Sequence, residues 1–177
     1  MVKSGKPLRA WLRSKRSHYL AIGVLLLFTT VFATGCLDRI FSLDEELKVR
    51  AVLDMVEHAY LGENREVLSR VIADSIVVIE GGQQHTYTQQ EFLDAVEQEW
   101  AGKDYDIWEV RILKITFASG NRDAAVSASL VTRNRGETLE DSPVQISLKK
   151  VVDAWKIVRI EFTQVGAART HGLPTVP

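Results

Sequence analysis

The chain has 177 residues, of which 46% are hydrophobic and 25% are charged, and its formal net charge is −1. This composition is typical of one ordinary folded domain, and it excludes a disordered, collagenous or disulfide-stapled chain. The charge is unevenly distributed, because the first 35 residues contain six Lys or Arg and no acidic residue. The rest of the chain holds 16 basic and 23 acidic residues, a net charge of −7, which argues against a nucleic-acid-binding domain.

The N-terminal segment has the order of a secretory signal. A basic stretch, residues 1–18, precedes an uncharged apolar run, residues 19–33, and small residues follow that run. Basic residues stay on the cytoplasmic side of a membrane while the apolar run enters the bilayer. We therefore expect residues 1–35 to be a signal peptide.

The only cysteine, Cys36, directly follows this signal, so the chain cannot form an internal disulfide. The sequence Ala33-Thr34-Gly35-Cys36 resembles the lipobox of bacterial lipoproteins, although that family usually has Leu where Ala33 stands. The resemblance implies that Cys36 receives a thioether-linked lipid and acyl chains such as palmitate. Residues 36–41 then form a lipidated tether.

The same resemblance implies a place in the bacterial cell envelope. The lipid anchor would hold the protein facing the periplasm, and the outer membrane is favoured over the inner one because no Asp directly follows Cys36. An uncleaved signal anchor is the alternative, since residues 19–35 lie at the lower edge of the length that spans a bilayer.

Two helices are expected at the start of the following domain. Ser42-Leu43-Asp44-Glu45 has the pattern of a capping box, and the apolar positions after it recur with helical spacing until Gly62. Leu47, Ala51 and Met55 widen this apolar face. Asn64 is a candidate N-cap for a second, short helix that ends near residues 74–75.

A strand, a turn and a third helix come next. The β-branched run 76–80 predicts a strand that turns at Gly81-Gly82. A second capping box, Thr88-Gln89-Gln90-Glu91, predicts a third helix that ends at Gly102.

The remainder of the domain is rich in β-type sequence. Turn signals separate four runs, which are residues 106–117, 124–133, 144–152 and 155–164. In the first run the alternation of apolar residues changes phase between Ile112 and Leu113, which predicts a β-bulge. Residues 166–177 show no periodicity, and we expect them to form a flexible tail.

This order of elements resembles that of the NTF2-like, or SnoaL-like, superfamily. The likeness extends over residues 42–165 and includes Ala73-Asp74-Ser75-Ile76 and Asp153-Ala154-Trp155-Lys156-Ile157-Val158. It implies an α+β fold, also described as cystatin-like, in which three N-terminal helices pack against a bent antiparallel sheet. In such a cone an apolar pocket serves catalysis in some members and binding or dimerisation in many.

Several side chains are candidates for lining that pocket. Large aromatic residues near a concave sheet can bind an apolar ligand or can simply fill the core. The pocket candidates are Tyr60, Trp100, Trp108, Trp155 and His58. An enzyme would also need an ionisable group in the cone, and the candidates are His58, Tyr60, Asp74, Glu80, His85, Glu109, Arg111, Arg159 and Glu161. The plain alternatives are a surface position for His58, a turn or cap for Asp74, and ion pairing for Glu109 with Arg111 and for Arg159 with Glu161.

The sequence gives no support for a metal or a cofactor. The four histidines His18, His58, His85 and His171 lack the spacing of a metal site, and neither a P-loop nor a GxSxG motif occurs.

Three functions are compatible with these observations. We favour a membrane-anchored, non-catalytic binding module for a small apolar ligand or an envelope protein, with a homodimer possible. A proton-transfer enzyme resembling ketosteroid isomerase is the second hypothesis. The third is a component resembling VirB8-like parts of secretion machines, held by an uncleaved signal anchor.

Overall fold

The computed structural model describes residues 43–174, so the predicted signal peptide, Cys36 and Ser42 lie outside the described residues. A long helix, residues 43–61, comes first. The elements that follow it are α2 (Arg65–Val71), β1 (Ile72–Glu80), β2 (Gln83–Thr88), α3 (Gln89–Trp100), β3 (Tyr105–Phe117), β4 (Asp123–Asn134), β5 (Glu140–Val151), β6 (Ala154–Phe162) and α4 (Ala167–Thr170).

Two of the predicted helix caps are confirmed. The side chain of Asn64 accepts a hydrogen bond from the amide of Val67 at 3.0 Å, and it thereby starts α2. Thr88 and Glu91 form the reciprocal capping box that starts α3. Helix α2 ends earlier than expected, because the chain is already extended at Ile72 and pairs there with β6.

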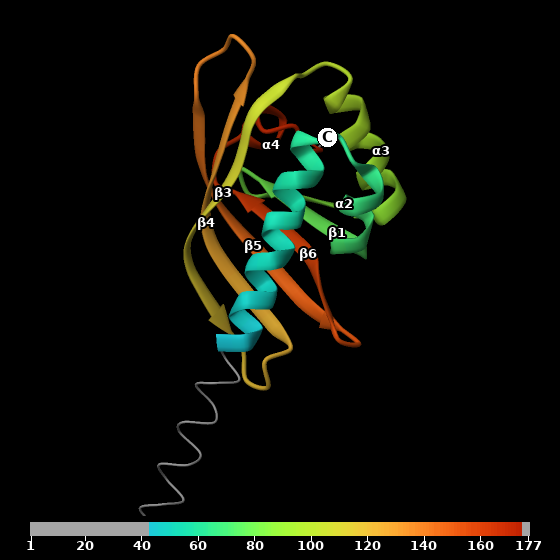
Figure 1. The fold of residues 1–177 in the computed structure, drawn as a ribbon, viewed down its shortest axis with the longest axis vertical. Coiled ribbons are helices and arrows are strands. Elements are labelled where there is room, and N and C mark those ends of the chain that lie inside the picture. Colours follow the sequence, from blue (N-terminus) through green and yellow to red (C-terminus); the bar gives the residue numbers. More distant parts are fainter. Residues whose placement is uncertain (1–42, 175–177) are drawn as a thin grey trace, which may run out of the picture. The chain divides into compact units, whose positions relative to one another are not determined.

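The six strands form one curved sheet, and the helices lie on one of its faces (Figure 1). The strand order is β2-β1-β6-β5-β4-β3, and every neighbouring pair is antiparallel except β1 and β6, which run parallel. We call the face that the helices cover the inner face and the opposite one the outer face. The predicted bent sheet is therefore present, with one parallel pair that the sequence did not indicate.

The β-bulge predicted in the first long strand is confirmed. Ile112 pairs with Ala128 and Lys114 pairs with Ser127, so Leu113 is an extra residue in β3. Leu113 is 75% exposed, while apolar residues on either side of it turn inward. The extra residue explains why the alternation of apolar residues changes phase at this point.

The core lies between the helices and the inner face of the sheet. The N-terminal helix contributes a stripe that includes Val49, Leu53 and Val56, and this stripe meets apolar residues of the strands. The expectation that Leu47, Ala51 and Met55 widen this face is wrong, because all three are exposed. Within residues 43–174, no helix combines the length and the apolarity that a membrane span requires.

Residues 166–174, which we call the C-terminal segment, do not form the flexible tail that the sequence suggested. They contain the short helix α4, and Ala168, His171 and Leu173 are buried against the rest of the domain. Small residues let this segment approach the sheet closely, and buried polar contacts, described below, hold it there. A lack of periodicity was therefore a poor indicator of flexibility in so short a segment.

Candidate functional site: the mouth of the cone

The interior of the cone is closed. The space between the helices and the sheet contains a cavity of about 20 Å³, which is room for about one water molecule. Fourteen side chains line it, and none of them is a carboxylate, a histidine, a lysine or an arginine. The lining includes Tyr60 and Trp108, and the side chain of Leu173 from the C-terminal segment completes it.

Three of the predicted pocket residues meet at one end of this space. Tyr60, in the last turn of the N-terminal helix, stacks on Trp108 of β3 with 4.1 Å between the ring centroids. Trp100, the last residue of α3, meets the edge of Tyr60 at 5.5 Å. We call this end of the cone, where these rings meet the C-terminal segment, the mouth.

The other two predicted pocket residues lie elsewhere. Trp155 packs against Phe117 with 5.9 Å between the centroids, and its Nε1 donates to Glu45 at 2.7 Å. Because Glu45 and Tyr60 are 15 residues apart on one helix, the two sites are separated by about 22 Å along its axis. His58 is exposed, and its Nδ1 lies 2.7 Å from the carbonyl oxygen of Asp54. Neither His58 nor Trp155 lines the cavity, and Trp100 is also absent from its lining, so Tyr60 and Trp108 are the two of the five candidates that line it.

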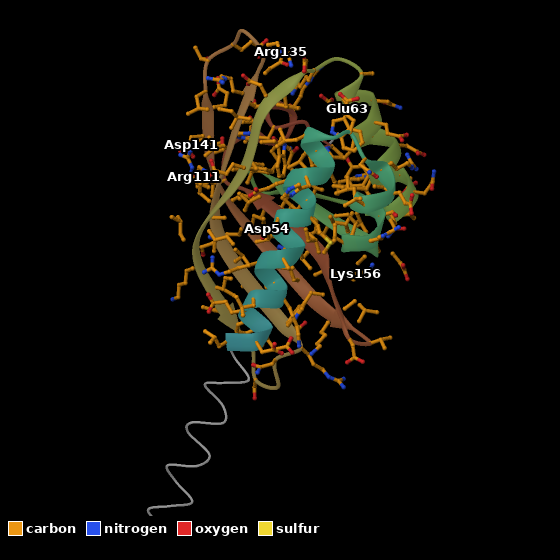
Figure 2. The ribbon with its side chains drawn as sticks, in the orientation of Figure 1. Asp54, Glu63, Arg111, Arg135, Asp141 and Lys156 are labelled. Carbon is orange, nitrogen blue, oxygen red and sulfur yellow. The ribbon has the colours of Figure 1, made fainter. Side chains whose placement is uncertain are left out.

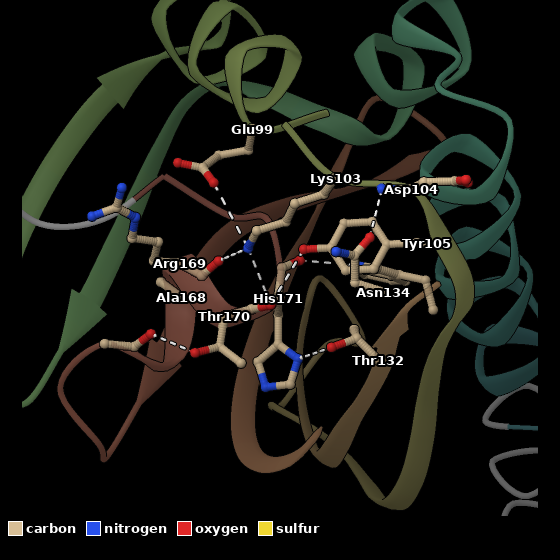
Figure 3. A network of polar contacts seen from close by, with 12 residues as sticks. Glu99, Lys103, Asp104, Tyr105, Thr132, Asn134, Ala168, Arg169, Thr170 and His171 are labelled. Carbon is tan, nitrogen blue, oxygen red and sulfur yellow. Dashed lines mark hydrogen bonds and ion pairs between the residues drawn. The ribbon is translucent and has the colours of Figure 1, made fainter. Parts of the chain in front are cut away.

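The mouth is closed by hydrogen bonds to three successive carbonyls of the C-terminal segment (Figure 3). Lys103 donates to the carbonyl oxygens of Arg169 and Thr170. The hydroxyl of Tyr105 donates to the same Thr170 oxygen at 3.2 Å, and Nε1 of Trp108 donates to the His171 oxygen at 3.0 Å.

Two buried side chains complete this closure. The imidazole Nδ1 of His171 lies 2.7 Å from the hydroxyl oxygen of Thr132, and its ring stacks on Phe162. On the other side of the segment, the carboxylate of Glu80 accepts a hydrogen bond from the amide of Ala168 at 2.8 Å. Glu80 is thus a structural anchor for α4.

Burial shifts the pKa of several groups at the mouth. Desolvation, together with the positive charge of Lys103, lowers the pKa of His171 to about 4, so the ring is neutral at pH 7. Desolvation also lowers the pKa of Lys103 and raises the pKa of Tyr105 and Tyr60. Between residues 43 and 174, three buried side-chain atoms have no hydrogen-bond partner, namely Tyr60 Oη, Trp100 Nε1 and His171 Nε2.

The ionisable candidates from the sequence do not converge on the cavity. Glu109 pairs with Arg111 at 3.0 Å, and Arg159 pairs with Glu161 at 2.6 Å. Each pair runs along one strand rather than across two. Asp74 is exposed, and the ring of His85 packs against Tyr87. Among residues 43–174 there is no cluster of three or more His, Cys, Asp or Glu side chains suited to a metal ion.

The outer face of the sheet is uncovered in the described part of the chain, and Arg111 and Asp141 project from it (Figure 2). Across its centre, Ser127 of β4 hydrogen-bonds to Gln145 of β5 at 3.0 Å, between small side chains such as Ala125. An open hollow of about 440 Å³ adjoins Ala125, Ser147 and Val158. The ion pairs of β3 and β6 flank this polar centre.

Sequence reasoning missed the residues that close the mouth. Lys103, Tyr105 and Thr132 follow no motif. Lys103 and Tyr105 contact backbone carbonyls, and Thr132 contacts the side chain of His171, all in a segment more than 30 residues away. The nearest signal was Gly166-Ala167-Ala168, followed by Gly172. Such a group of small residues permits close packing, but it does not reveal where the packing occurs.

No protein-family model matches the chain, and no curated protein matches it. Solved structures do. An NTF-2-like protein of unknown function from Shewanella oneidensis MR-1 is 15% identical, with a TM-score of 0.55 over 64% of this chain and 94% of that one. An NTF-2-like protein of unknown function from Silicibacter pomeroyi DSS-3 is 12% identical, with a TM-score of 0.51 over 68% and 96% of the two chains.

This chain has an NTF2-like fold. A conserved protein from Planctomyces limnophilus DSM 3776 is also similar, with 20% identity and a TM-score of 0.54 over 67% of this chain and 94% of that one. At these identities the NTF2-like likeness defines the α+β architecture and leaves the activity to be argued from the site.

Proposed function

We propose that this chain is a lipid-anchored protein of the bacterial cell envelope whose NTF2-like domain binds a protein partner and catalyses no reaction. The observation that carries the proposal is the closed interior of the cone. Its cavity of about 20 Å³ compares with roughly 300 to 1,000 Å³ for pockets that hold small ligands. Binding at the surface therefore fits this domain better than binding of a small apolar ligand inside it.

The chemistry of the interior also argues against proton transfer. A general acid or base must reach the substrate, and the cavity lining contains no carboxylate and no imidazole. The hydroxyl of Tyr60 belongs to a lining residue, but burial raises its pKa well above the physiological range. The cavity lining therefore offers no general base for a ketosteroid-isomerase-like proton transfer.

The outer face of the sheet offers the surface for a partner. Its centre is built from small or uncharged side chains such as Ala125 and Gln145, while the ion pairs Glu109–Arg111 and Arg159–Glu161 lie at its sides. Such a surface fits a partner whose own binding surface is flat and carries both positive and negative side chains at its edge. Charges in these positions contribute more to specificity than to affinity.

Lipid attachment is tested at Cys36. With a radioactive fatty acid supplied to the cells, the wild-type chain should become labelled, and Cys36→Ala should abolish both the label and the maturation. A chain that keeps residues 1–35 in the membrane and takes up no label would instead support the signal anchor.

Partner binding is tested by a photo-cross-linking amino acid at Gln145, with the exposed helix residue Gln90 as the matched control position. We expect a discrete adduct from Gln145 and none from Gln90. Adding Ala125→Arg to the Gln145 probe should remove the adduct without unfolding the domain. Mass spectrometry of the adduct identifies the partner, and it would also reveal a second copy of this chain in that role. No adduct, together with a small molecule that co-purifies at fixed mass, would contradict the proposal.

A further inference from the structure

The C-terminal segment sits at the mouth as a bound peptide would. Side-chain donors of Lys103, Tyr105 and Trp108 contact its three successive carbonyls, and Leu173 enters the apolar lining of the cavity. Backbone carbonyls are present in every peptide, so these contacts recognise the end of a short helical turn, α4, rather than one particular side chain. Specificity comes from the small residues that fit the narrow approach.

The receptor side of this contact is held independently of the segment. Trp108 pairs with Thr132 across the ladder between β3 and β4, and Tyr105 pairs with Asn134. Lys103 is fixed near Glu99, with 3.8 Å between the charged atoms. Since strand pairing positions Tyr105 and Trp108, we expect these two donors to remain in place when the segment leaves.

The segment is buried against the sheet, but side-chain contacts hold it there rather than strand pairing. It is not a strand of the sheet, and α4 has four residues, far fewer than a helix needs to be stable alone. The connection from β6 is exposed, with Val165 84% accessible to solvent. The segment is also an imperfect occupant, because it buries Nε2 of His171 with no hydrogen-bond partner.

We propose that the mouth of the cone is a peptide-binding site that residues 166–174 occupy in this chain, and that a partner protein offering the same pattern displaces them. The pattern is three successive carbonyls at the end of a short helical turn, then a glycine and an apolar residue. This site is separate from the outer face of the sheet, so the proposal is tested independently of the function proposed above.

Gly172 gives the proposal a sharp test of specificity. Its φ is +70°, and a Cβ at this position would lie 2.8 Å from the hydroxyl oxygen of Tyr105. A peptide with alanine there therefore meets both backbone strain and a steric clash. We expect its affinity to fall about tenfold or more.

The experiment uses the full-length protein with a protease site inserted between Gln164 and Val165, which are both exposed. The protein is folded first and cut afterwards, so that folding does not depend on a truncated chain. A fluorescent peptide of residues 166–177 is then added. We expect saturable binding at one peptide per chain and release of the original segment, with the circular dichroism of the domain unchanged.

Three controls accompany this binding measurement. The Gly172→Ala peptide should bind about tenfold more weakly, and Tyr105→Phe in the receptor should weaken the wild-type peptide several-fold. The uncut protein should bind little peptide, because its tethered segment competes at a high effective concentration.

Other results would overturn the proposal. These are a cut protein that stays folded but takes up no peptide, one that unfolds as its segment leaves, and equal affinity for the wild-type and Gly172→Ala peptides. Absence of peptide binding together with dimers that need residues 166–174 would indicate exchange of the segment between two copies instead.

Discussion

His171 is fully buried and stays neutral because its surroundings do not accommodate a charged ring. The ring lies between Phe162 and Thr132, and the positive charge of Lys103 disfavours protonation, while the carboxylate of Asp141 favours it weakly. The net effect lowers the pKa of His171 to about 4, against an ordinary value of 6.5. This one residue therefore couples closure of the mouth to pH.

The stability of the domain should fall as the pH drops from 6.5 toward 4. In that range the unfolded chain binds a proton at His171 that the folded chain resists, so acid favours unfolding. Between pH 7 and pH 5 we expect a loss of about 2 kcal/mol in the free energy of unfolding.

Urea titrations at several pH values measure this loss. His171→Asn should flatten the pH dependence, and the exposed His58→Asn is the matched control that should leave it unchanged. A wild-type protein whose stability is the same at pH 7 and pH 5 would show that His171 does not carry this coupling.

At the scale of elements, one carboxylate fixes the start of the N-terminal helix to the sheet. Glu45 accepts hydrogen bonds from Trp155 at 2.7 Å and from Lys150 at 2.8 Å, and Lys48 also contacts it. Burial alone raises the pKa of Glu45, but these donors outweigh it and lower the pKa to about 2. The carboxylate is therefore ionised throughout the physiological range.

Glu45→Gln should lower the free energy of unfolding by about 1 to 3 kcal/mol, because it removes the buried negative charge to which Lys150 and Trp155 donate hydrogen bonds. Glu46→Gln is the matched control, since Glu46 forms an exposed pair with Arg50 and should cost less than about 0.5 kcal/mol. Chemical denaturation at pH 7 measures both. Equal effects of the two substitutions would show that the contact with the sheet contributes little.

The elements that the sequence predicted well are those with a local cause. Asn64, the Thr88–Glu91 box and the phase change at Ile112 each act within four residues, so their effects were visible in the sequence. The end of α2 was missed because Val71-Ile72 is β-branched and suits a helix end or a strand equally. Only pairing with β6, more than 80 residues away, decides it.

At the scale of the whole molecule, three of the five predicted pocket residues lie together at one end of the fold. Tyr60, Trp100 and Trp108 meet at the mouth, because the end of the N-terminal helix, the end of α3 and the start of β3 converge there. Trp155 does not join them, since its position depends on how β6 aligns with β5, which no local pattern reveals. The parallel pairing of β1 with β6 was hidden for the same reason.

The closed cone behaves as a core, and a change in its lining tests this directly. Leu130 is buried and lines the cavity, so Leu130→Ala should lower the free energy of unfolding by about 2 to 5 kcal/mol. The substitution enlarges an apolar cavity, and the surrounding side chains relax only partly to fill it. Leu113→Ala on the neighbouring strand is the matched control and should cost less than about 0.5 kcal/mol, because Leu113 is exposed.

Benzene provides the second measurement on the same two variants. A ligand that binds only the folded state raises the melting temperature, and an enlarged apolar cavity that stays dry can hold benzene. We expect benzene to stabilise Leu130→Ala and to leave the wild type and Leu113→Ala unchanged, because their cavity has room for about one water molecule. A wild-type protein that benzene stabilises would have more usable space than this, and it would favour the small apolar ligand over the protein partner.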